Sequence, residues 1–364
     1  MNTQRIRRVL IYRLGSLGDT VVAVPALHLI ERSFPAARRV LLTNMRTHAN
    51  APAAFTVLEG SGLVHDFIEY PFQTRSVRQL ARLWWKVVRF RPQVLVYLIP
   101  KRGEHSLLRD RWFFRLCGAS QIIGLPEGDL AQPVYNQQTK LFEHESARLM
   151  RSIRSLGHLD LDDLANWDLR LTQAEQDKAS ELLGGLGGVP LIACGPGTKM
   201  PAKDWGQENW RELLGRLSAE WPRHGLILVG AEQDFEVSNY ISEKWAGPVV
   251  NLCGLPPRET AAVLRQVELF LGPDSGQMHL SAALGTPCAI AFASRMRRGP
   301  WYPTGEGHEV VYHELPCSLC GLEVCVEKAN ACLTSISVDE MLAAAIRARK
   351  NRQLSQGGSH AQAR

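Results

Sequence analysis

The chain has 364 residues, of which 45% are hydrophobic and 21% charged, and its formal net charge is +6. This length suits two domains of roughly 150 to 200 residues. The sequence has no run of the ~18 apolar residues that a membrane helix needs, and the apolar stretch at 9–12 is too short for a signal-peptide core. We therefore expect a cytoplasmic globular protein, and the positive charge favours an anionic partner without choosing among phosphate, lipid and nucleic acid.

The first half of the chain alternates strand and helix patterns. Strand-like runs occupy 9–13, 39–43 and 94–99, and helical spacing follows the first of them over 20–32. This alternation predicts a parallel sheet with helices on both faces.

The loop after the first strand-like run reads LGSLGD over 14–19. It lacks the third glycine of a dinucleotide-binding fingerprint. Ser16 and Asp19 have the spacing of a helix capping box, which would be enough to explain Asp19. The alternative is that Asp19 acts as a general base in a cleft.

A basic stripe is predicted on a helix further along the first half. It could rest on an anionic membrane surface, or it could be the solvated outer face of an ordinary packed helix. Its residues are Arg75, Arg78, Arg82, Lys86 and Arg89, with Leu80, Trp84 and Val87 beside them. Lys101, Arg102 and Arg109 are further candidates for binding the acidic groups of a ligand.

The pattern changes between about 155 and 188, where acidic irregular sequence precedes a capping box at Thr172 and Glu175. We place the first domain at 1–170 and the second at 171–349. Residues 350–364 are polar and lack periodicity, which predicts a disordered tail.

The second half repeats the alternation of strands and helices. Ligands of doubly wound domains bind at the carboxyl ends of the strands, so the loops there are the candidate sites. The predicted strands are 191–195, 226–230, 249–254, 267–272 and 288–293.

Two of these loops have the character of phosphate sites. After the strand at 267–272, Asp274, Ser275 and Gly276 precede a helix with His279 in its first turn. A helix start attracts phosphate, although Asp274 or Ser275 could simply cap the helix. The loop after 191–195 is not a Walker loop, but it offers Thr198 as a hydroxyl donor and Lys203 as a charge for a diphosphate.

The eight cysteines fall into two groups. Cys117, Cys194, Cys253 and Cys288 lie in apolar surroundings and are predicted to be small core residues. Four closely spaced thiols predict a structural zinc site, with iron–sulfur ligation or unligated thiols as alternatives. They are Cys317, Cys320, Cys325 and Cys332.

Four segments together resemble glycosyltransferase family nine, the heptosyltransferases that build the inner core of bacterial lipopolysaccharide. The last is the most specific. They are LGSLGDTVVAVPAL at 14–27, HESARLMRSIRSLG at 144–157, PGTKMPAKDW at 196–205 and GPDSGQMHLSAALGTP at 272–287. The resemblance implies a GT-B architecture, with two doubly wound Rossmann-like α/β domains facing a cleft. It also implies an acceptor-binding N-terminal domain, a C-terminal domain that binds an ADP-sugar, inversion at the anomeric carbon and no metal required for catalysis.

The resemblance also assigns roles to single residues. Asp19 matches the base that deprotonates the acceptor, Thr198 and Lys203 match diphosphate contacts, and Glu232 matches a ribose contact. The donor loop is matched by Asp274, Ser275, Gly276 and His279. Two departures from the family pattern are Gly206, where proline is common, and the segment AFASRMRRGPWYPTGEGH at 291–308.

We therefore expect a cytoplasmic, inverting glycosyltransferase at the inner face of the inner membrane. It would transfer a heptose-like sugar from an ADP-sugar, with ADP-heptose favoured, to a lipopolysaccharide core or other lipid-linked acceptor, in peripheral contact with anionic lipid. Alternatives are another nucleotide sugar as donor, a nucleotide-sugar epimerase, or a nucleic-acid-binding protein, which would leave Asp19 and the two phosphate-type loops unexplained.

Overall fold

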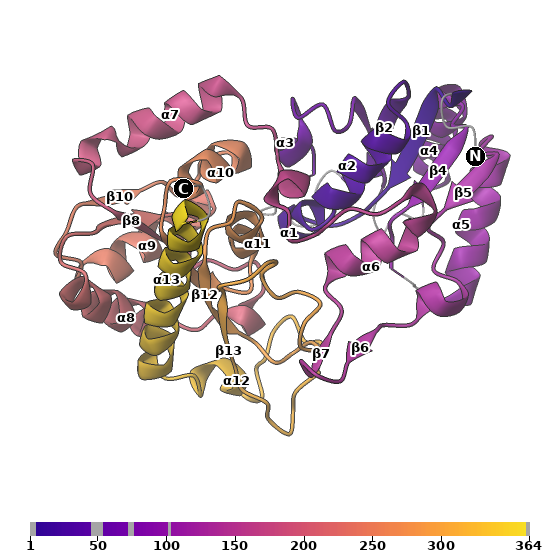
Figure 1. The fold of residues 1–364 in the computed structure, drawn as a ribbon. Coiled ribbons are helices and arrows are strands. Elements are labelled where there is room, and N and C mark those ends of the chain that lie inside the picture. The colour runs from indigo at the N-terminus through magenta and orange to yellow at the C-terminus, as the bar shows by residue number, and fades with distance from the viewer. Residues whose placement is uncertain (1–4, 45–53, 72–75, 101–102, 362–364) are drawn as a thin grey trace. The chain divides into compact units, whose positions relative to one another are not determined.

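A computed structural model of the protein describes residues 5–44, 54–71, 76–100 and 103–361, with side chains described as far as residue 351 (Figure 1). The chain divides into two compact units, Met1–Arg170 and Leu171–Arg364. Each unit has its own parallel sheet, so the α/β class with two doubly wound domains that the sequence predicts is confirmed.

The first unit is built on a five-stranded sheet in the order β3-β2-β1-β4-β5, and every neighbouring pair of strands is parallel. The central strand β1 is buried along most of its length, as expected for a parallel strand covered on both faces. The strands are β1 (Arg8–Tyr12), β2 (Arg38–Thr43), β3 (Asp66–Glu69), β4 (Val94–Tyr97) and β5 (Gln121–Ile123), and an antiparallel pair is formed by β6 (Tyr135–Asn136) and β7 (Leu141–Phe142).

Helices α4 and α5 pack on one face of this sheet, where Leu83 and Val87 of α4 and Leu107 and Phe114 of α5 share an apolar cluster with strand residues. Arg91 in the left-handed conformation ends α4. The helices of the unit are α1 (Leu17–Val21), α2 (Val24–Ser33), α3 (Phe55–Leu58), α4 (Val77–Phe90), α5 (Glu104–Leu116) and α6 (Glu145–Ser152).

The second unit has a six-stranded sheet in the order β10-β9-β8-β11-β12-β13, again parallel throughout. Its core includes Trp205 and Trp210, whose rings meet edge to face with centroids 4.7 Å apart. The strands are β8 (Leu191–Cys194), β9 (Gly225–Leu228), β10 (Val249–Asn251), β11 (Leu269–Pro273), β12 (Cys288–Phe292) and β13 (Glu309–Tyr312).

The helices of the second unit begin with α7, which opens with the predicted capping box of Thr172 and Glu175. The long helix α13 buries Met341, Ala344 and Ala348 in the core of the unit. The helices are α7 (Gln173–Leu183), α8 (Gln207–Glu220), α9 (Phe235–Ser242), α10 (Pro257–Leu264), α11 (Gly276–Ala283), α12 (Ala331–Thr334) and α13 (Val338–Ala361).

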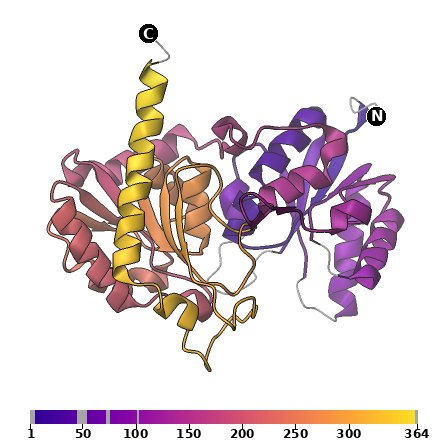
Figure 2. The same cartoon turned by 60° about the horizontal axis from the view of Figure 1, so that its bottom comes forward.

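Within the tail that was predicted to be disordered at 350–364, α13 continues to Ala361 (Figure 2), and residues 362–364 lie outside the described range. Once the packed first turns have nucleated a helix, each further residue adds a hydrogen bond at small cost. Lysine, arginine, glutamine and leucine, which predominate at 350–354, have high helix propensity.

Each sheet changes winding direction at a pair of neighbouring strands, β1 and β4 in the first unit and β8 and β11 in the second. Loops that leave such a pair diverge and open a crevice at the carboxyl ends of the strands. Within the described ranges, no helix is long and apolar enough to cross a bilayer.

Candidate functional site

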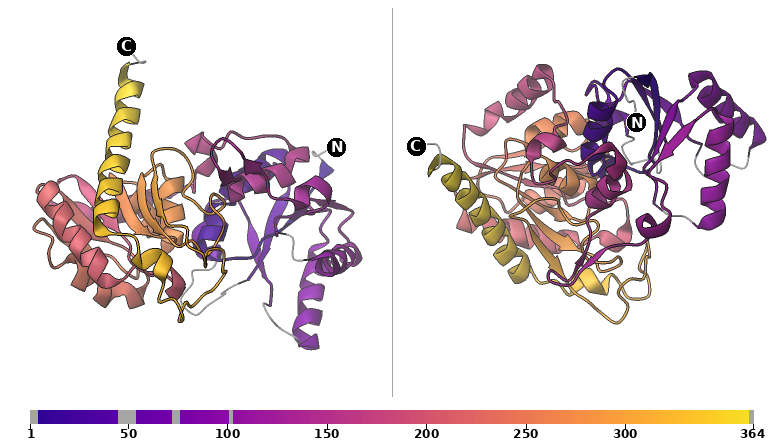
Figure 3. Two further views of the ribbon diagram at one scale, coloured as in Figure 1. Left: turned by 90° about the horizontal axis from the view of Figure 1, so that it is seen from below. Right: turned by 45° about the vertical axis from the view of Figure 1, so that its right-hand side comes forward.

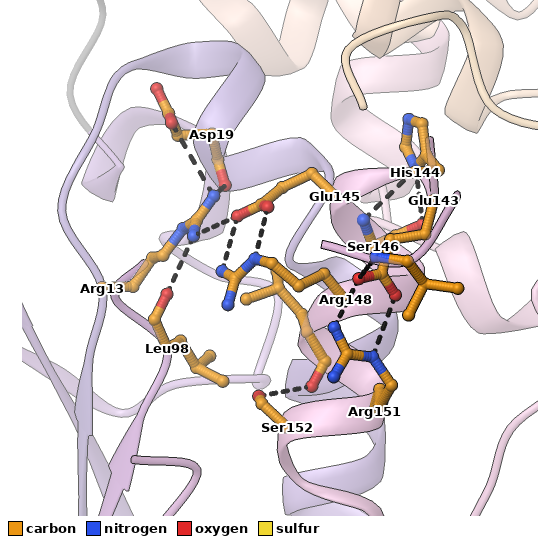
Figure 4. A network of polar contacts seen from close by, with 12 residues as sticks. Arg13, Asp19, Leu98, Glu143, His144, Glu145, Ser146, Arg148, Arg151 and Ser152 are labelled. Atoms are coloured by element: carbon orange, nitrogen blue, oxygen red, sulfur yellow. Dashed lines mark hydrogen bonds and ion pairs between the residues drawn. The ribbon is translucent and has the colours of Figure 1, made fainter. Parts of the chain in front are cut away.

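Arg13 organises a cluster of polar side chains in the first unit, where β1 and β4 end (Figure 4). This buried side chain donates from Nη1 to the carbonyl oxygen of Leu98 at 2.8 Å. Its Nε and Nη2 donate to the carbonyl oxygen of Asp19 at 3.2 and 3.1 Å, and Nη2 lies 3.7 Å from the Asp19 carboxylate. Arg13 therefore ties the Asp19 loop to the neighbouring strand.

Glu145, at the start of α6, is the counter-charge of Arg13. Its Oε1 accepts from Arg13 Nη1 at 2.8 Å, and Arg148 donates to both of its carboxylate oxygens, at 2.7 and 2.8 Å. Burial by itself would raise the pKa of Glu145, but the hydrogen bonds and positive charges of Arg148 and Arg13 outweigh burial and lower it to about 2. Glu145 is therefore ionised at neutral pH and lies between two guanidinium groups.

Asp19 is both a capping residue and an accessible carboxylate. Its Oδ2 accepts from the backbone N–H of Ser16 at 2.9 Å and from the Ser16 hydroxyl at 3.3 Å, which completes the predicted capping box. Its side chain is nevertheless 31% exposed. The loop thus holds the carboxylate in place while leaving part of it open to a ligand.

Gly15 and Asn44 fix the backbone beside Asp19. A Cβ on Gly15 would lie 2.2 Å from the Cβ of Asp19, and Gly15 has a φ of +145°, so only glycine fits. The buried Asn44 accepts from the Gly15 N–H at 2.7 Å and donates to the Gly15 carbonyl at 2.9 Å.

In the second unit, Lys203 and Asp274 come together from the loops that follow β8 and β11. Lys203 Nζ lies 2.7 Å from Asp274 Oδ2, and both side chains are largely buried. The buried Trp205 anchors the end of the Lys203 loop, because its Nε1 donates to the carbonyl oxygen of Ile336 at 3.0 Å. Asp274 therefore orients the lysine and neutralises part of its charge.

The start of α11 lies beside this pair. Ser275 is the N-cap residue, and its hydroxyl accepts from the N–H of Met278 at 3.5 Å, so the predicted capping role is present. Gly276 is the first residue of the helix. The His279 ring is buried and lies edge to face against Trp301 at 5.9 Å, which fixes its orientation.

Thr198 and Glu232 follow the neighbouring strands β8 and β9 at the carboxyl edge of the second sheet. The Thr198 hydroxyl makes turn contacts with Met200, at 3.3 Å to its N–H and 3.4 Å to its carbonyl. Glu232 is exposed in the turn before α9. The two loops touch at Gly197, where a Cβ would lie 2.1 Å from Asp234 Oδ2. Burial raises the pKa of Asp234, against the opposing effect of its hydrogen bond from the Ala231 N–H.

The cysteine-rich segment packs against the Lys203 loop, since Ala202 N–H donates to the carbonyl of Glu323 at 3.0 Å. Cys320 is exposed, and the other three cysteines of the segment, Cys317, Cys325 and Cys332, are partly buried. Among the residues that the structure describes, no group of three or more His, Cys, Asp or Glu side chains is arranged to hold a metal.

The predicted core cysteines behave as expected: Cys117, Cys194 and Cys288 are buried, and Cys253 is partly buried. Of the candidate acceptor contacts, Arg109 is paired with Asp110 at 2.8 Å. Lys101 and Arg102 lie outside the described residues.

Sequence reasoning missed Arg13, Asn44 and Asp234, and it proposed that the segment ending at Trp301 contacts a ligand without foreseeing the contact of Trp301 with His279. Arg13 and Asn44 each follow a strand directly, which is a signal that could have found them. Trp301 lies in the segment that departs from the family pattern, and nothing in the local sequence links it to His279.

A comparison with known protein families matches residues 112–330 to glycosyltransferase family 9 (heptosyltransferase), which is well over half of the chain. The chain belongs to glycosyltransferase family 9. Family 9 membership makes the protein a glycosyltransferase and speaks against the epimerase and nucleic-acid-binding alternatives.

The proteins that this family 9 chain resembles are described as heptosyltransferases or as family 9 glycosyltransferases. It is 22% identical over 350 residues to lipopolysaccharide heptosyltransferase 1 of Pseudomonas aeruginosa, covering 87% of each chain. A family 9 glycosyltransferase of Veillonella parvula superposes with a TM-score of 0.67 at 16% identity, covering 94% of this chain and 97% of that one. The ADP-heptose LPS heptosyltransferase II of E. coli has a TM-score of 0.64 at 16% identity, covering 95% and 99%. These structures show that the chain has the GT-B fold of heptosyltransferases.

Proposed function

We propose that this protein transfers a heptose from ADP-heptose to a lipopolysaccharide core acceptor, with inversion at the anomeric carbon. The observation that carries the proposal is the Lys203–Asp274 pair beside the start of α11, at the switch point of the second sheet. A compact cation and a helix N-terminus are what a leaving diphosphate requires. The relatives point to the same donor, because one E. coli structure contains ADP-2-deoxy-2-fluoro heptose.

In the proposed reaction, the Asp19 carboxylate accepts the proton of the acceptor hydroxyl. The hydroxyl oxygen forms a bond to the anomeric carbon while the bond from that carbon to the diphosphate oxygen breaks, so ADP leaves from the opposite face. A single displacement of this kind inverts the configuration. The capping hydrogen bonds from Ser16 and the Arg13 contacts support the role by holding the carboxylate in one orientation.

On the donor side, Lys203 and the backbone N–H groups at Gly276 would neutralise the charge that develops on the leaving diphosphate. Thr198, Ser275 and His279 would add hydrogen bonds, and Glu232 would accept from the ribose. These groups would supply the positive potential without a catalytic metal. Lys203 is already held by Asp274 at 2.7 Å, so little reorganisation is needed during the reaction.

We propose that the reaction takes place at the cytoplasmic face of the inner membrane, in peripheral contact with anionic lipids. Lipopolysaccharide precursors are lipid-anchored, and the exposed basic residues Arg78, Arg82 and Lys86 of α4 support such a contact.

The structural zinc predicted from the cysteine spacing stays a prediction. Because the four thiols as placed are not arranged around a common centre, binding would require the segment at 317–332 to rearrange. Metal analysis of the purified protein and of Cys320→Ser checks it: about one equivalent of zinc, lost in the variant, is the expected result, and a metal-free wild-type protein would refute it.

The proposed function is tested with purified protein, ADP-heptose and a core-oligosaccharide acceptor. We expect stoichiometric release of ADP and a product whose anomeric configuration, measured by NMR, is opposite to that of the donor. Activity should persist in a chelator. Calorimetry with ADP, UDP, GDP and CMP should show selective binding of ADP. Preference for another nucleotide would overturn the donor assignment, and retention of configuration would overturn the mechanism.

A further inference from the structure

Helix α4 has an unusual outer face. Only Leu83 and Val87 of the helix are fully buried. Trp85 lies two residues from each of them, so it projects from the opposite side, and it is 55% exposed. Val77 is 79% exposed, and Leu80 and Trp84 are 45% exposed each. Large apolar side chains that solvent reaches to this extent cost free energy unless another surface covers them.

Helix α5 packs on the same face of the sheet as α4 (Figure 3), and it also carries large apolar side chains that are exposed. Trp112 lies two residues from the buried Asp110 and Phe114, so it too projects away from the core, and it is 66% exposed. Leu108 and Leu116 lie one turn before and one turn after it, and they are 49% and 75% exposed. The stripe of Leu108, Trp112 and Leu116 has the spacing of a single helix face.

Positive charge accompanies the apolar side chains. No Asp or Glu occurs between Glu69 and Glu104 in the sequence. Arg78, Arg82 and Lys86 are exposed, and in the described part of the chain none of the three forms an ion pair. Arg89 lies over the Trp85 ring at 5.3 Å. On α5, Arg109 pairs with Asp110 and Arg111 pairs with Glu127.

Arg75, the first residue of the predicted stripe, lies outside the described residues, and Val87 is buried rather than beside the stripe.

We propose that the outer faces of α4 and α5 form a docking face for an anionic phospholipid bilayer. Trp85 and Trp112 would enter the headgroup boundary, where indole rings partition, and Arg78, Arg82 and Lys86 would bind lipid phosphates. Apolar side chains interleaved with unpaired cations match a surface that is apolar inside and anionic outside, whereas a protein partner would need shape complementarity. The inference rests on the proposed function only in taking the acceptor to be lipid-linked.

The docking face is tested by sedimenting the full-length protein with vesicles. We expect binding to vesicles of phosphatidylethanolamine and phosphatidylglycerol, weaker binding at high salt, and little binding to phosphatidylcholine alone. Trp112→Ser combined with Leu116→Ser should lower the partition coefficient about tenfold or more, as should Arg82→Gln combined with Lys86→Gln. Leu164→Ser, 53% exposed in the same unit, and Lys178→Gln, in the second unit, are matched controls that should bind like the wild type.

Melting temperatures should stay unchanged, because all of these side chains are exposed. Equal binding to neutral and anionic vesicles, or full binding by the double variants, would overturn the docking face. So would a dimer in sedimentation velocity that Trp112→Ser dissociates, because a second copy would then cover the surface.

Transfer to a lipid-free core oligosaccharide should be the same in these variants as in the wild type. A protein that binds vesicles but transfers no heptose would refute the proposed function and leave the docking face standing. A protein that transfers heptose but does not bind anionic vesicles would refute the docking face and the proposed lipid contact, and would leave the proposed transfer reaction standing.

Discussion

Arg13 donates to Glu145 at 2.8 Å, and both side chains are more than nine-tenths buried. Arg148 completes the group from the next turn of α6. Replacing Glu145 with alanine would leave Arg148 without this counter-charge and the deeply buried Arg13 with only the more distant Asp19 carboxylate at 3.7 Å. We expect Glu145→Ala to lower the free energy of unfolding by about 3–5 kcal/mol, measured by urea denaturation. Arg154→Ala, which breaks an exposed pair with Asp129, is the control and should cost less than about 1 kcal/mol.

The same carboxylate predicts a dependence of stability on pH. The pKa of Glu145 is lowered from 4.5 to about 2 in the folded protein. A depressed pKa stabilises the folded state above the unfolded value, and this contribution is lost as the pH falls from about 4.5 through about 2. It amounts to about 3 kcal/mol by linkage. Glu145→Gln should therefore reduce the loss of stability over this window, and identical pH profiles for the two proteins would contradict the assignment.

Asp19→Asn tests the proposed base. Asparagine can still accept from the Ser16 N–H, so the cap and the melting temperature should change little. We expect kcat for heptose transfer to fall by about 10²- to 10⁴-fold, while ADP affinity measured by calorimetry stays the same. Asp66→Asn, on an exposed pair with Arg38 in the same unit, should retain full activity. A decrease of less than tenfold in the Asp19 variant would exclude it as the base.

Lys203 is expected to contribute a charge-assisted hydrogen bond to the donor diphosphate. Lys203→Met should weaken ADP binding by about 10- to 100-fold, and it should also destabilise the fold because it leaves Asp274 buried and unpaired. Adding Asp274→Asn should recover stability without recovering affinity. If the double variant binds ADP as tightly as the wild type, Lys203 is a structural residue and not a donor contact.

Gly197 tests how closely the Lys203 loop approaches the turn before α9. A Cβ there would meet Asp234 Oδ2 at 2.1 Å, and that carboxylate already holds the Ala231 N–H at 2.8 Å. We expect Gly197→Ala to cost about 1–3 kcal/mol of unfolding free energy and to weaken ADP binding. Gly184→Ala, where nothing lies within 4 Å of the added methyl group, is the matched control. Equal denaturation midpoints would show that the loop simply shifts.

Much of the site was visible in the sequence because its signals are local. The capping box joins Ser16 to Asp19 across three residues, and the loops at Thr198 and Ser275 are marked by the strands before them and the helices after them. Family 9 membership was predicted from four such segments. The basic stripe of α4 was predicted as well, but the orientation of the helix was not. Helical spacing places Leu80, Trp84 and Val87 near one another without showing which of them contacts the sheet. In the structure, Val87 is the one that is buried.

The sequence by itself determined the class of fold, the strand ends at which functional residues would lie and the residue types available there. These features depend on neighbours a few positions apart in the chain. Only the tertiary structure decided which of those residues pair. Arg13 and Glu145 are separated by 132 positions, and Lys203 meets Asp274 because β8 and β11 are adjacent in the sheet. A buried charge requires a partner within hydrogen-bonding distance, and the order of the strands and the packing of α6, which no local pattern encodes, determine what that partner is.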